Sequence, residues 1–198
     1  MINWILENWI EVFGAVAGIL YIYLSIKQNI LLWPFGLVTS LVYIYVFFVA
    51  KFYADMSLQF YYVFISIYGW LLWKKSEKNT EEESLKVSRI RLKLAIILFL
   101  ITLGIFAVIA WILVNYTDSP MPYWDALTTA ASITATWMLA KKIIEHWYIW
   151  VVVNLISIGL YFVRELYPTV ILFTIYAVMA VIGYLQWKKS LVNIKENN

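Results

Sequence analysis

The sequence contains no cysteine and a single histidine, His146. Disulfides, thiolate metal sites and cysteine nucleophiles are therefore excluded. His146 alone cannot form a histidine-rich metal site, and its place beside Glu145 in a short turn predicts a solvated side chain. The sequence also lacks a Ser–His–Asp set, paired carboxylates and a glycine-rich phosphate loop. We therefore expect neither an enzyme nor a bound cofactor or metal.

Charged residues are also scarce, at 14% of the 198 residues, whereas 64% are hydrophobic and the mean hydropathy is +0.79. A soluble domain averages about 25% charged residues, and a chain of this size must cover its surface with polar groups. A lipid-facing surface explains the difference, so the lipid bilayer is the expected environment. The net charge of +3 predicts no nucleic-acid partner, because the basic residues lie where membrane topology places them.

Seven apolar segments are long enough to cross a bilayer as helices, since a crossing needs about 20 residues. Helices are expected because lipid offers the backbone no hydrogen bonds. The sequence thus predicts an all-α integral membrane protein with seven transmembrane helices, and no signal peptide is expected before the first of them. The predicted helices cover residues 9–26, 31–50, 54–73, 94–114, 123–140, 147–163 and 167–187.

The basic residues predict how the chain is oriented. With the N-terminus outside, 13 Lys and Arg residues face the cytoplasm and only Lys51 and Arg164 face outward. This is the bias that the positive-inside rule describes. We therefore expect a multi-pass protein of the bacterial inner membrane, with the N-terminus outside and the C-terminus cytoplasmic.

An internal repeat relates the first three predicted helices to the last three without a gap, at a shift of 114 residues. Each helix of the second copy comes four helices after its counterpart, so the copies run in parallel, and the fourth helix inverts the chain between them. The result is a 3+1+3 arrangement, and because carriers built from repeats commonly bind substrate near the midplane between them, it favours transport. The matched pairs include Lys27 with Lys141, Trp33 with Trp147, Tyr62 with Tyr176, Gly69 with Gly183, and Trp73-Lys74-Lys75 with Trp187-Lys188-Lys189.

The repeat divides the chain into five segments. Residues 1–73 form the first three-helix unit and residues 123–189 the second. Between them lie a charged cytoplasmic loop at residues 74–93, which we interpret as solvated, and the linker helix at residues 94–122. Residues 190–198 form a cytoplasmic tail.

No acidic or basic residue falls in the middle of a predicted span, whereas ion-coupled carriers usually keep such charges there. This favours facilitated diffusion. Glu11 and Asp125 lie near the outer ends of the first helix of each unit, and either compensate the helix dipole or form a vestibule that attracts cations.

Neutral polar groups remain within the spans, and Gln59 and Asn154 are the most informative. Trp150 precedes Asn154 by four residues, so both lie on one helix face. An aromatic plane beside an amide suits a heteroaromatic ligand, and a cationic ring would add about 0.5–2 kcal/mol of cation–π attraction. The alternative is that the amides hydrogen-bond neighbouring helices and that Trp150 simply packs.

Several segments resemble the PnuC family of nicotinamide riboside transporters, over nearly the whole chain apart from the charged loop. They are Leu32-Trp33-Pro34-Phe35-Gly36, Phe52-Tyr53-Ala54-Asp55-Met56 with Gln59, Ser66-Ile67-Tyr68-Gly69-Trp70, Ala140-Lys141-Lys142, Glu145-His146-Trp147, Trp150 through Asn154, and Leu172 through Trp187.

The resemblance implies a SWEET-like 3+1+3 fold and uniport of an unphosphorylated vitamin that a cytoplasmic kinase traps. It also implies that Trp150, Asn154 and Gln59 bind the substrate, and we add Ser40 and Tyr62 as candidates. Trp150 and Asn154 align with Gly36 and Ser40 in the repeat, so the second unit should provide more of the grip.

Three hypotheses remain open from the sequence. The first is a nicotinamide riboside carrier. The second is a thiamine carrier like PnuT of the same family, since both vitamins carry a cationic aromatic ring. The third is a membrane scaffold that transports nothing. The expected partner is a small cationic vitamin, and whether the chain forms a homo-oligomer is left open.

Overall fold

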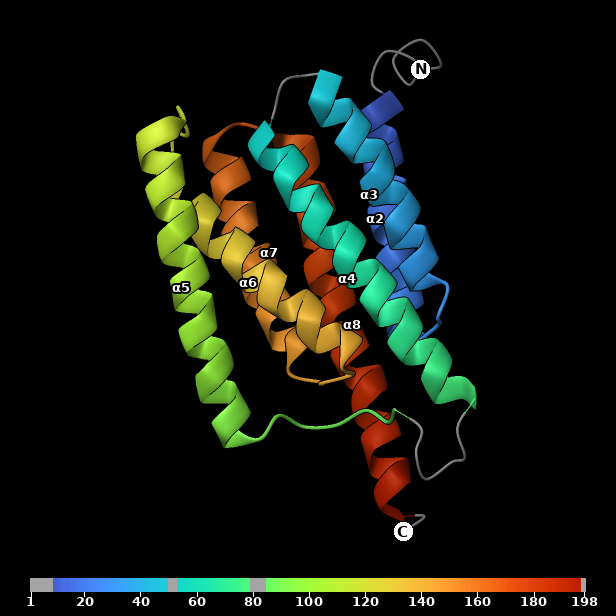
Figure 1. Cartoon of the computed structure of the whole chain (residues 1–198). Helices are drawn as coiled ribbons and strands as arrows, with labels where there is room; N and C mark the ends of the chain where they lie inside the picture. The colour runs from blue at the N-terminus through green and yellow to red at the C-terminus, as the bar shows by residue number, and fades with distance from the viewer. Residues whose placement is uncertain (1–8, 50–52, 79–84, 197–198) are drawn as a thin grey trace. The chain divides into compact units, whose positions relative to one another are not determined.

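The computed structural model describes residues 9–49, 53–78 and 85–196, which form seven helices (Figure 1). All seven helices predicted from hydropathy are confirmed, and the first predicted span has the observed bounds. The largest differences lie at the C-terminal ends of the third and last helices, which continue past their Trp-Lys-Lys sequences. The helices are α2 (Trp9–Ile26), α3 (Leu32–Val49), α4 (Tyr53–Lys78), α5 (Leu92–Tyr116), α6 (Pro122–Ala140), α7 (His146–Val163) and α8 (Tyr167–Glu196).

The chain divides into two compact units, a first unit of residues 1–84 and a second of residues 85–198. In the first unit α3 packs mainly against α4, and in the second α7 packs mainly against α8. Helix α6 lies between α5 and α7. The linker helix α5 therefore belongs to the second unit, whereas the sequence suggested a separate segment.

The α2–α3 connection of the first unit and the α6–α7 connection of the second have the same backbone conformation. Gln28 and Lys142, which are 114 residues apart, both have a φ of 52°. Each chain reversal is closed by the same backbone hydrogen bonds, so the repeat extends to the backbone. In the first unit the backbone N–H to carbonyl bonds are Gln28 to Ser25, Asn29 to Leu24, Leu32 to Asn29 and Trp33 to Ile30. In the second unit they are Lys142 to Leu139, Ile143 to Met138, His146 to Ile143 and Trp147 to Ile144.

A tryptophan follows each of these turns and packs against α4 in the first unit and against α8 in the second. In the first unit Trp33 is fully buried and meets Trp73 edge-on, with ring centroids 5.5 Å apart at 87°. A Cβ atom at Gly69 would lie only 2.5 Å from the Trp33 ring. The ring therefore lies directly on the α4 backbone, which only glycine permits.

The second unit repeats this contact with Trp147 and Trp187, whose ring centroids are 5.8 Å apart at 86°. A Cβ atom at Gly183 would again lie 2.5 Å from the Trp147 ring. In lipid, close packing at small residues replaces the hydrophobic effect as the main cause of helix association. We therefore regard the tryptophan–glycine contact as the main lock of each unit.

Residues 85–91, which we call the strap, join the charged loop to α5 and lie along the α6–α7 turn. The Ser88 N–H donates to the Lys142 carbonyl and the Ile144 N–H donates to the Ser88 carbonyl, each at 3.0 Å. The Ile90 N–H donates to Glu145 Oε2 at 3.0 Å, and Val87 is buried. This part of the predicted solvated loop is thus an ordered piece of the second unit.

Helix α5 is also fastened to α6 along its length. Leu98 joins Met138 and Ile143 in a buried cluster near the strap. Further along, the hydroxyl oxygens of Thr102 and Thr134 are 2.7 Å apart and share a hydrogen bond. The strap and these contacts explain why the linker helix associates with the second unit.

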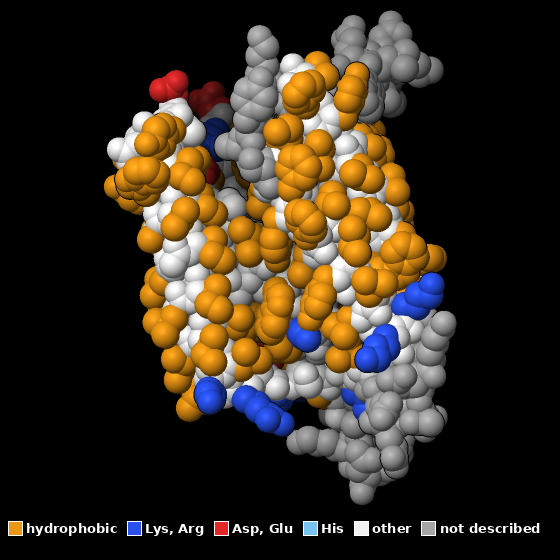
Figure 2. Space-filling model, viewed as in Figure 1, with side chains coloured by type: hydrophobic (Ala, Val, Ile, Leu, Met, Phe, Trp, Pro, Cys, Tyr) orange, Lys and Arg blue, Asp and Glu red, His pale blue; other side chains and the backbone are white. Residues whose placement is uncertain are grey.

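Large hydrophobic side chains cover the flanks of the helices, as Figure 2 shows for one face, while Lys and Arg lie near helix ends. Among the described residues, Leu92–Tyr116, His146–Val163 and Tyr167–Leu191 are long and apolar enough to cross a membrane. Val12–Ile26 and Leu32–Val46 are shorter apolar helices. The chain is therefore a multi-pass membrane protein by composition.

The tryptophan–glycine lock predicts that Gly183→Ala destabilises the protein by about 1–3 kcal/mol, because the added methyl group overlaps the Trp147 ring. Gly159→Ala in α7 is the matched control, since a Cβ there meets nothing within 4 Å. Thermal unfolding in detergent measures both variants. Equal melting temperatures for the two would contradict the lock.

Candidate functional site

Asn154 lies at the middle of α7, eight residues from its first residue, His146. Its side chain is 4% exposed, and no group among the described residues forms a hydrogen bond with it. Trp150, half-buried, lies one helical turn earlier on the same face.

The face of α7 that carries Asn154 packs against α8. Trp147 and Tyr161, seven residues before and after Asn154, both contact α8: Trp147 lies on Gly183, and the Tyr161 ring lies 5.0 Å from Phe173. The Phe173 ring also lies 5.4 Å from Tyr176. Asn154 therefore lies between two aromatic residues on this face of α7. Tyr161 was not predicted from the sequence, although its spacing of seven residues from Asn154 places both on one helix face.

In the first unit, Ser40 occupies the position in α3 that Asn154 occupies in α7. It is 5% exposed and again lies at the middle of an 18-residue helix. Gln59 and Tyr62 are half-buried on α4, where Tyr62 packs edge-on against Tyr61 with centroids 5.5 Å apart. Three candidate residues thus belong to the first unit, whereas Trp150 and Asn154 belong to the second.

The acidic candidate Asp125 lies in the first turn of α6 and forms an ion pair with Arg164. Arg164, which follows α7, donates to both carboxylate oxygens at 3.0 and 3.1 Å, and the Ser119 hydroxyl donates to one of them at 2.6 Å. The pair joins the ends of α6 and α7 opposite the strap. The Asp125 carboxylate thus already accepts three hydrogen bonds, one of its partners being a cation. That it also attracts a cationic substrate into a vestibule stays a prediction. The side chain of Glu11 lies outside the described residues.

The prediction that His146 is solvated is wrong, because its side chain is fully buried. Its ring packs against Trp147 and Trp187, with centroids 4.6 and 4.8 Å away. Nδ1 lies 2.7 Å from the Ile143 carbonyl oxygen, so Nδ1–H donates a hydrogen bond and the carbonyl accepts it. The repeat explains the burial, since His146 aligns with Leu32, which is also fully buried.

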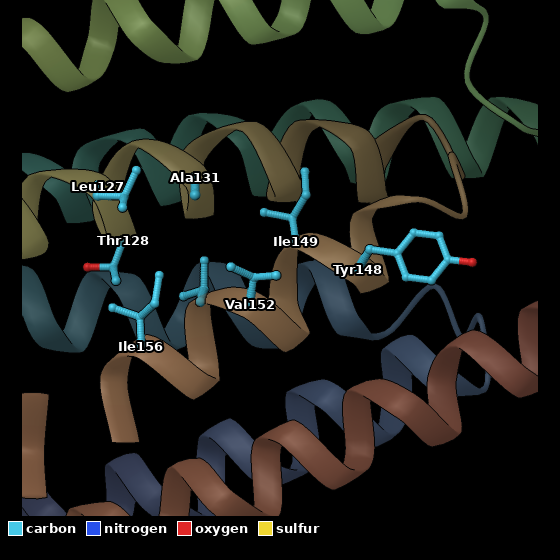
Figure 3. Close-up of a pocket in the computed structure, with 8 residues that line it drawn as sticks. Leu127, Thr128, Ala131, Tyr148, Ile149, Val152 and Ile156 are labelled. Atoms are coloured by element: carbon cyan, nitrogen blue, oxygen red, sulfur yellow. The ribbon is translucent and has the colours of Figure 1, made fainter. Parts of the chain in front are cut away.

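A cavity of about 260 Å³ opens between α6 and α7 in the second unit (Figure 3). Leu127 and Ala131 of α6 face Ile149, Val152 and Ile156 of α7 across it, and Tyr148 extends away from the group. This wall is almost entirely apolar and includes neither Trp150 nor Asn154. It therefore suits an aliphatic chain better than a polar vitamin.

The described residues hold no cluster of three or more His, Asp or Glu side chains arranged as metal ligands. The candidate residues instead carry neutral amide, hydroxyl and aromatic groups. Groups of these kinds are able to stack on a ligand and to form hydrogen bonds with it.

Comparison with known proteins gives consistent matches along most of the chain. A family profile described as "Nicotinamide mononucleotide transporter" matches residues 8–189. The nicotinamide riboside transporter PnuC of Escherichia coli is 27% identical over 92% of this chain and 86% of its own. PnuC of Neisseria mucosa is 28% identical over 92% of this chain and 73% of its own.

Two further matches concern structure and substrate. A crystal structure of the vitamin B3 transporter PnuC superposes with a TM-score of 0.73 at 25% identity, covering 94% of this chain and 83% of that one. The riboflavin/roseoflavin transporter RibM of Streptomyces davaonensis is 20% identical over 90% of this chain and 84% of its own. Relatives with this sequence pattern therefore differ in the vitamin that they are named for.

The burial of His146 against two tryptophan rings predicts that His146→Leu transports at the wild-type rate and with an unchanged pH dependence. Leucine occupies the aligned position in the first unit, so it fits a site of this shape. Uptake measured from about pH 5.5 to about pH 8 checks this, because that interval extends at least about one pH unit to each side of the usual histidine pKa of about 6.5. A variant that folds but loses a pH-dependent component of transport would show that His146 carries protons.

Proposed function

The chain belongs to the nicotinamide mononucleotide transporter family, and from this premise we propose that it carries nicotinamide riboside across the membrane by facilitated diffusion. The observation that supports this most strongly is the match to relatives named nicotinamide riboside transporter over most of both chains. An enzymatic role has no support from this family of transporters.

The proposed architecture is seven membrane crossings arranged as 3+1+3 with parallel repeats. The shared turns and the shared tryptophan–glycine contacts support the repeat, because both recur at the 114-residue interval. Shifting α3 by this interval also produces the bounds of α7. Transport would then follow from movement of the first unit against the second, as in other carriers built from repeats.

The proposed orientation places the strap and the α6–α7 turn in the cytoplasm of a bacterium and the N-terminus outside. In the second unit, Lys86, Arg89, Lys141 and Lys142 lie in the strap or the adjacent turn, whereas Arg164 lies at the other end. This distribution agrees with the positive-inside rule.

We assign the main grip on the substrate to Trp150 and Asn154, with Gln59, Ser40 and Tyr62 contributing from the first unit. The amide of Asn154 can donate to and accept from a carboxamide, because it carries both functions and has no partner among the described residues. The indole of Trp150 can stack on a pyridinium ring, with cation–π attraction of about 0.5–2 kcal/mol.

Neutral groups in the spans support a uniport mechanism. The ion pair of Arg164 with Asp125 lies at helix ends, and α7, which carries Asn154, contains no Asp, Glu, Lys or Arg. Net uptake would then depend on a cytoplasmic kinase that phosphorylates the riboside, since a phosphate group prevents its return.

Uptake of labelled nicotinamide riboside into proteoliposomes is expected without any ion gradient. Trp150→Ala and Asn154→Ala should each reduce uptake at least tenfold, because each removes a group that contacts the substrate. Trp111→Ala, an exposed tryptophan of α5, and Leu155→Ala, an exposed neighbour of Asn154, are the matched controls and should transport normally. A requirement for a proton or sodium gradient would contradict uniport.

A thiamine carrier is the second candidate, because thiamine also has a cationic aromatic ring that Trp150 could stack on. Binding calorimetry of the purified protein with nicotinamide riboside, thiamine and riboflavin separates the alternatives. We expect tight binding of the riboside and at least tenfold weaker binding of the other two. Preferential binding of thiamine or riboflavin would replace the proposed substrate, and binding of none would favour a scaffold.

A further inference from the structure

The apolar cavity between α6 and α7, which we call the groove, opens at the surface of the second unit. Among its lining residues Val153 is 4% exposed, whereas Leu127, Tyr148 and Val152 are 36%, 52% and 55% exposed. Its residues on α7 run from Tyr148 to Ile156, which is about 12 Å along the helix axis. A long apolar groove that is open on one side suits part of a hydrocarbon chain.

The hydroxyl groups that line the groove are used elsewhere. Thr128 donates to the carbonyls of Trp124 and Asp125 in its own helix, at 3.1 Å each. The Tyr148 ring extends away from the cavity (Figure 3) and packs on Tyr184 of α8, with centroids 4.7 Å apart. A polar vitamin would leave its hydrogen-bonding groups unpaired in such a groove, which is costly, whereas an alkyl chain has none.

One end of the groove lies beside the strap. Ile149 lines the groove and Ile90 belongs to the strap, and both pack against the same buried cluster. The Ile90 N–H also donates to Glu145 Oε2 at 3.0 Å, about one helical turn before Tyr148. The strap is therefore fixed next to the end of the groove that Tyr148 forms.

Positive charge is concentrated at this end of the second unit. Residues 85–93 carry four Lys or Arg and residues 141–148 carry two, against the single acid Glu145. Arg89 is exposed, and its neighbours Ser88 and Ile90 are hydrogen-bonded to the α6–α7 turn. No carboxylate among the described residues forms an ion pair with Arg89, which is close enough to Tyr148 to interact electrostatically. An exposed cation thus lies at the end of an apolar groove.

The first unit has larger side chains at the aligned positions. Leu127 and Ile149, which line the groove, align with Phe13 and Phe35. The Phe13 ring lies 6.3 Å from the ring of Tyr43, so aromatic side chains of α2 and α3 meet there. The groove is therefore specific to the second unit, which is also the unit that has the strap.

We propose that the groove and Arg89 together bind one anionic phospholipid, with an acyl chain along α7 and the phosphate group at Arg89. The charge selects an anion and the apolar wall selects a chain, and a phospholipid supplies both. Neither Trp150 nor Asn154 lines the groove, so this site is separate from the one proposed for the vitamin. The bound lipid links the strap to α6 and α7 and stabilises the second unit.

Thermal unfolding of the purified full chain in neutral detergent tests the headgroup contact. Dioleoyl phosphatidylglycerol should raise the melting temperature more than dioleoyl phosphatidylcholine does. Arg89→Gln should raise the phosphatidylglycerol concentration needed for half of this shift about fivefold, the usual contribution of one basic residue. Lys27→Gln, at an exposed basic residue in the aligned turn of the first unit, is the matched control and should respond as the wild type. Equal effects of the two lipids on the wild type would overturn the proposal.

The chain contact is tested by filling the groove. Ile149→Phe introduces the residue that the first unit has at this position and should weaken the phosphatidylglycerol response while leaving Arg89 in place. A second measurement needs no variant: phosphatidylglycerol with a photoactivatable group in its acyl chain should label the segment from Tyr148 to Ile156. Excess phosphatidylglycerol should suppress this label, and excess phosphatidylcholine should not. Equal suppression by both lipids would show unspecific contact with the bilayer and overturn the site.

The other possible occupants give different results. A shift of the same size with glycerol phosphate, which has no acyl chain, would assign Arg89 to a soluble anion. Loss of the photolabel on adding nicotinamide riboside would assign the groove to the transport pathway, and its loss on dimerisation would assign it to a second copy. Each of these results overturns the lipid site. A wild-type protein that responds to phosphatidylglycerol but binds no riboside supports the lipid site, and only the proposed function then fails.

Discussion

The contact of a tryptophan ring with a glycine backbone organises each half of this protein. Trp33 lies on Gly69 and Trp147 on Gly183, and in both cases a second tryptophan meets the ring edge-on. Lipid provides no hydrophobic driving force between helices, so association depends on how closely they approach. A glycine allows the ring to reach the backbone. The turn before each tryptophan then has to bring it there, which explains why both turns keep the same hydrogen bonds.

The two repeats have the same backbone turns but carry different side chains at aligned positions. At one level of the repeat the first unit has Tyr21, Gly36 and Ser66, and the second has Ala135, Trp150 and Ala180. Swapping which helix carries the large residue keeps the volume filled, since packed helices tolerate neither voids nor overlap. The chemistry changes from an indole to a phenol.

Hydrogen bonds and an ion pair tie the second unit at both ends of α6 and α7. The strap is bonded to the α6–α7 turn of the second unit through Ser88 and Ile90, and Arg164 joins the opposite ends of the same two helices. In the first unit Asn29 caps its own turn, with Oδ1 accepting from the Leu31 N–H. Helix α5 thereby adds to the second unit, although it lies between the repeats in sequence.

Much of this could be predicted from the sequence, because the determining signals are local. Hydropathy predicts the helices, since lipid requires each segment to satisfy its own backbone, and the 114-residue register predicts that Trp33 and Trp147 are equivalent. Contacts between distant residues could not be predicted. That His146 is buried, that Asp125 meets Arg164 and that Tyr21 takes the space beside Gly36 depend on how the helices pack. Helical periodicity shows which face a residue lies on, but only the tertiary structure decides what that face meets.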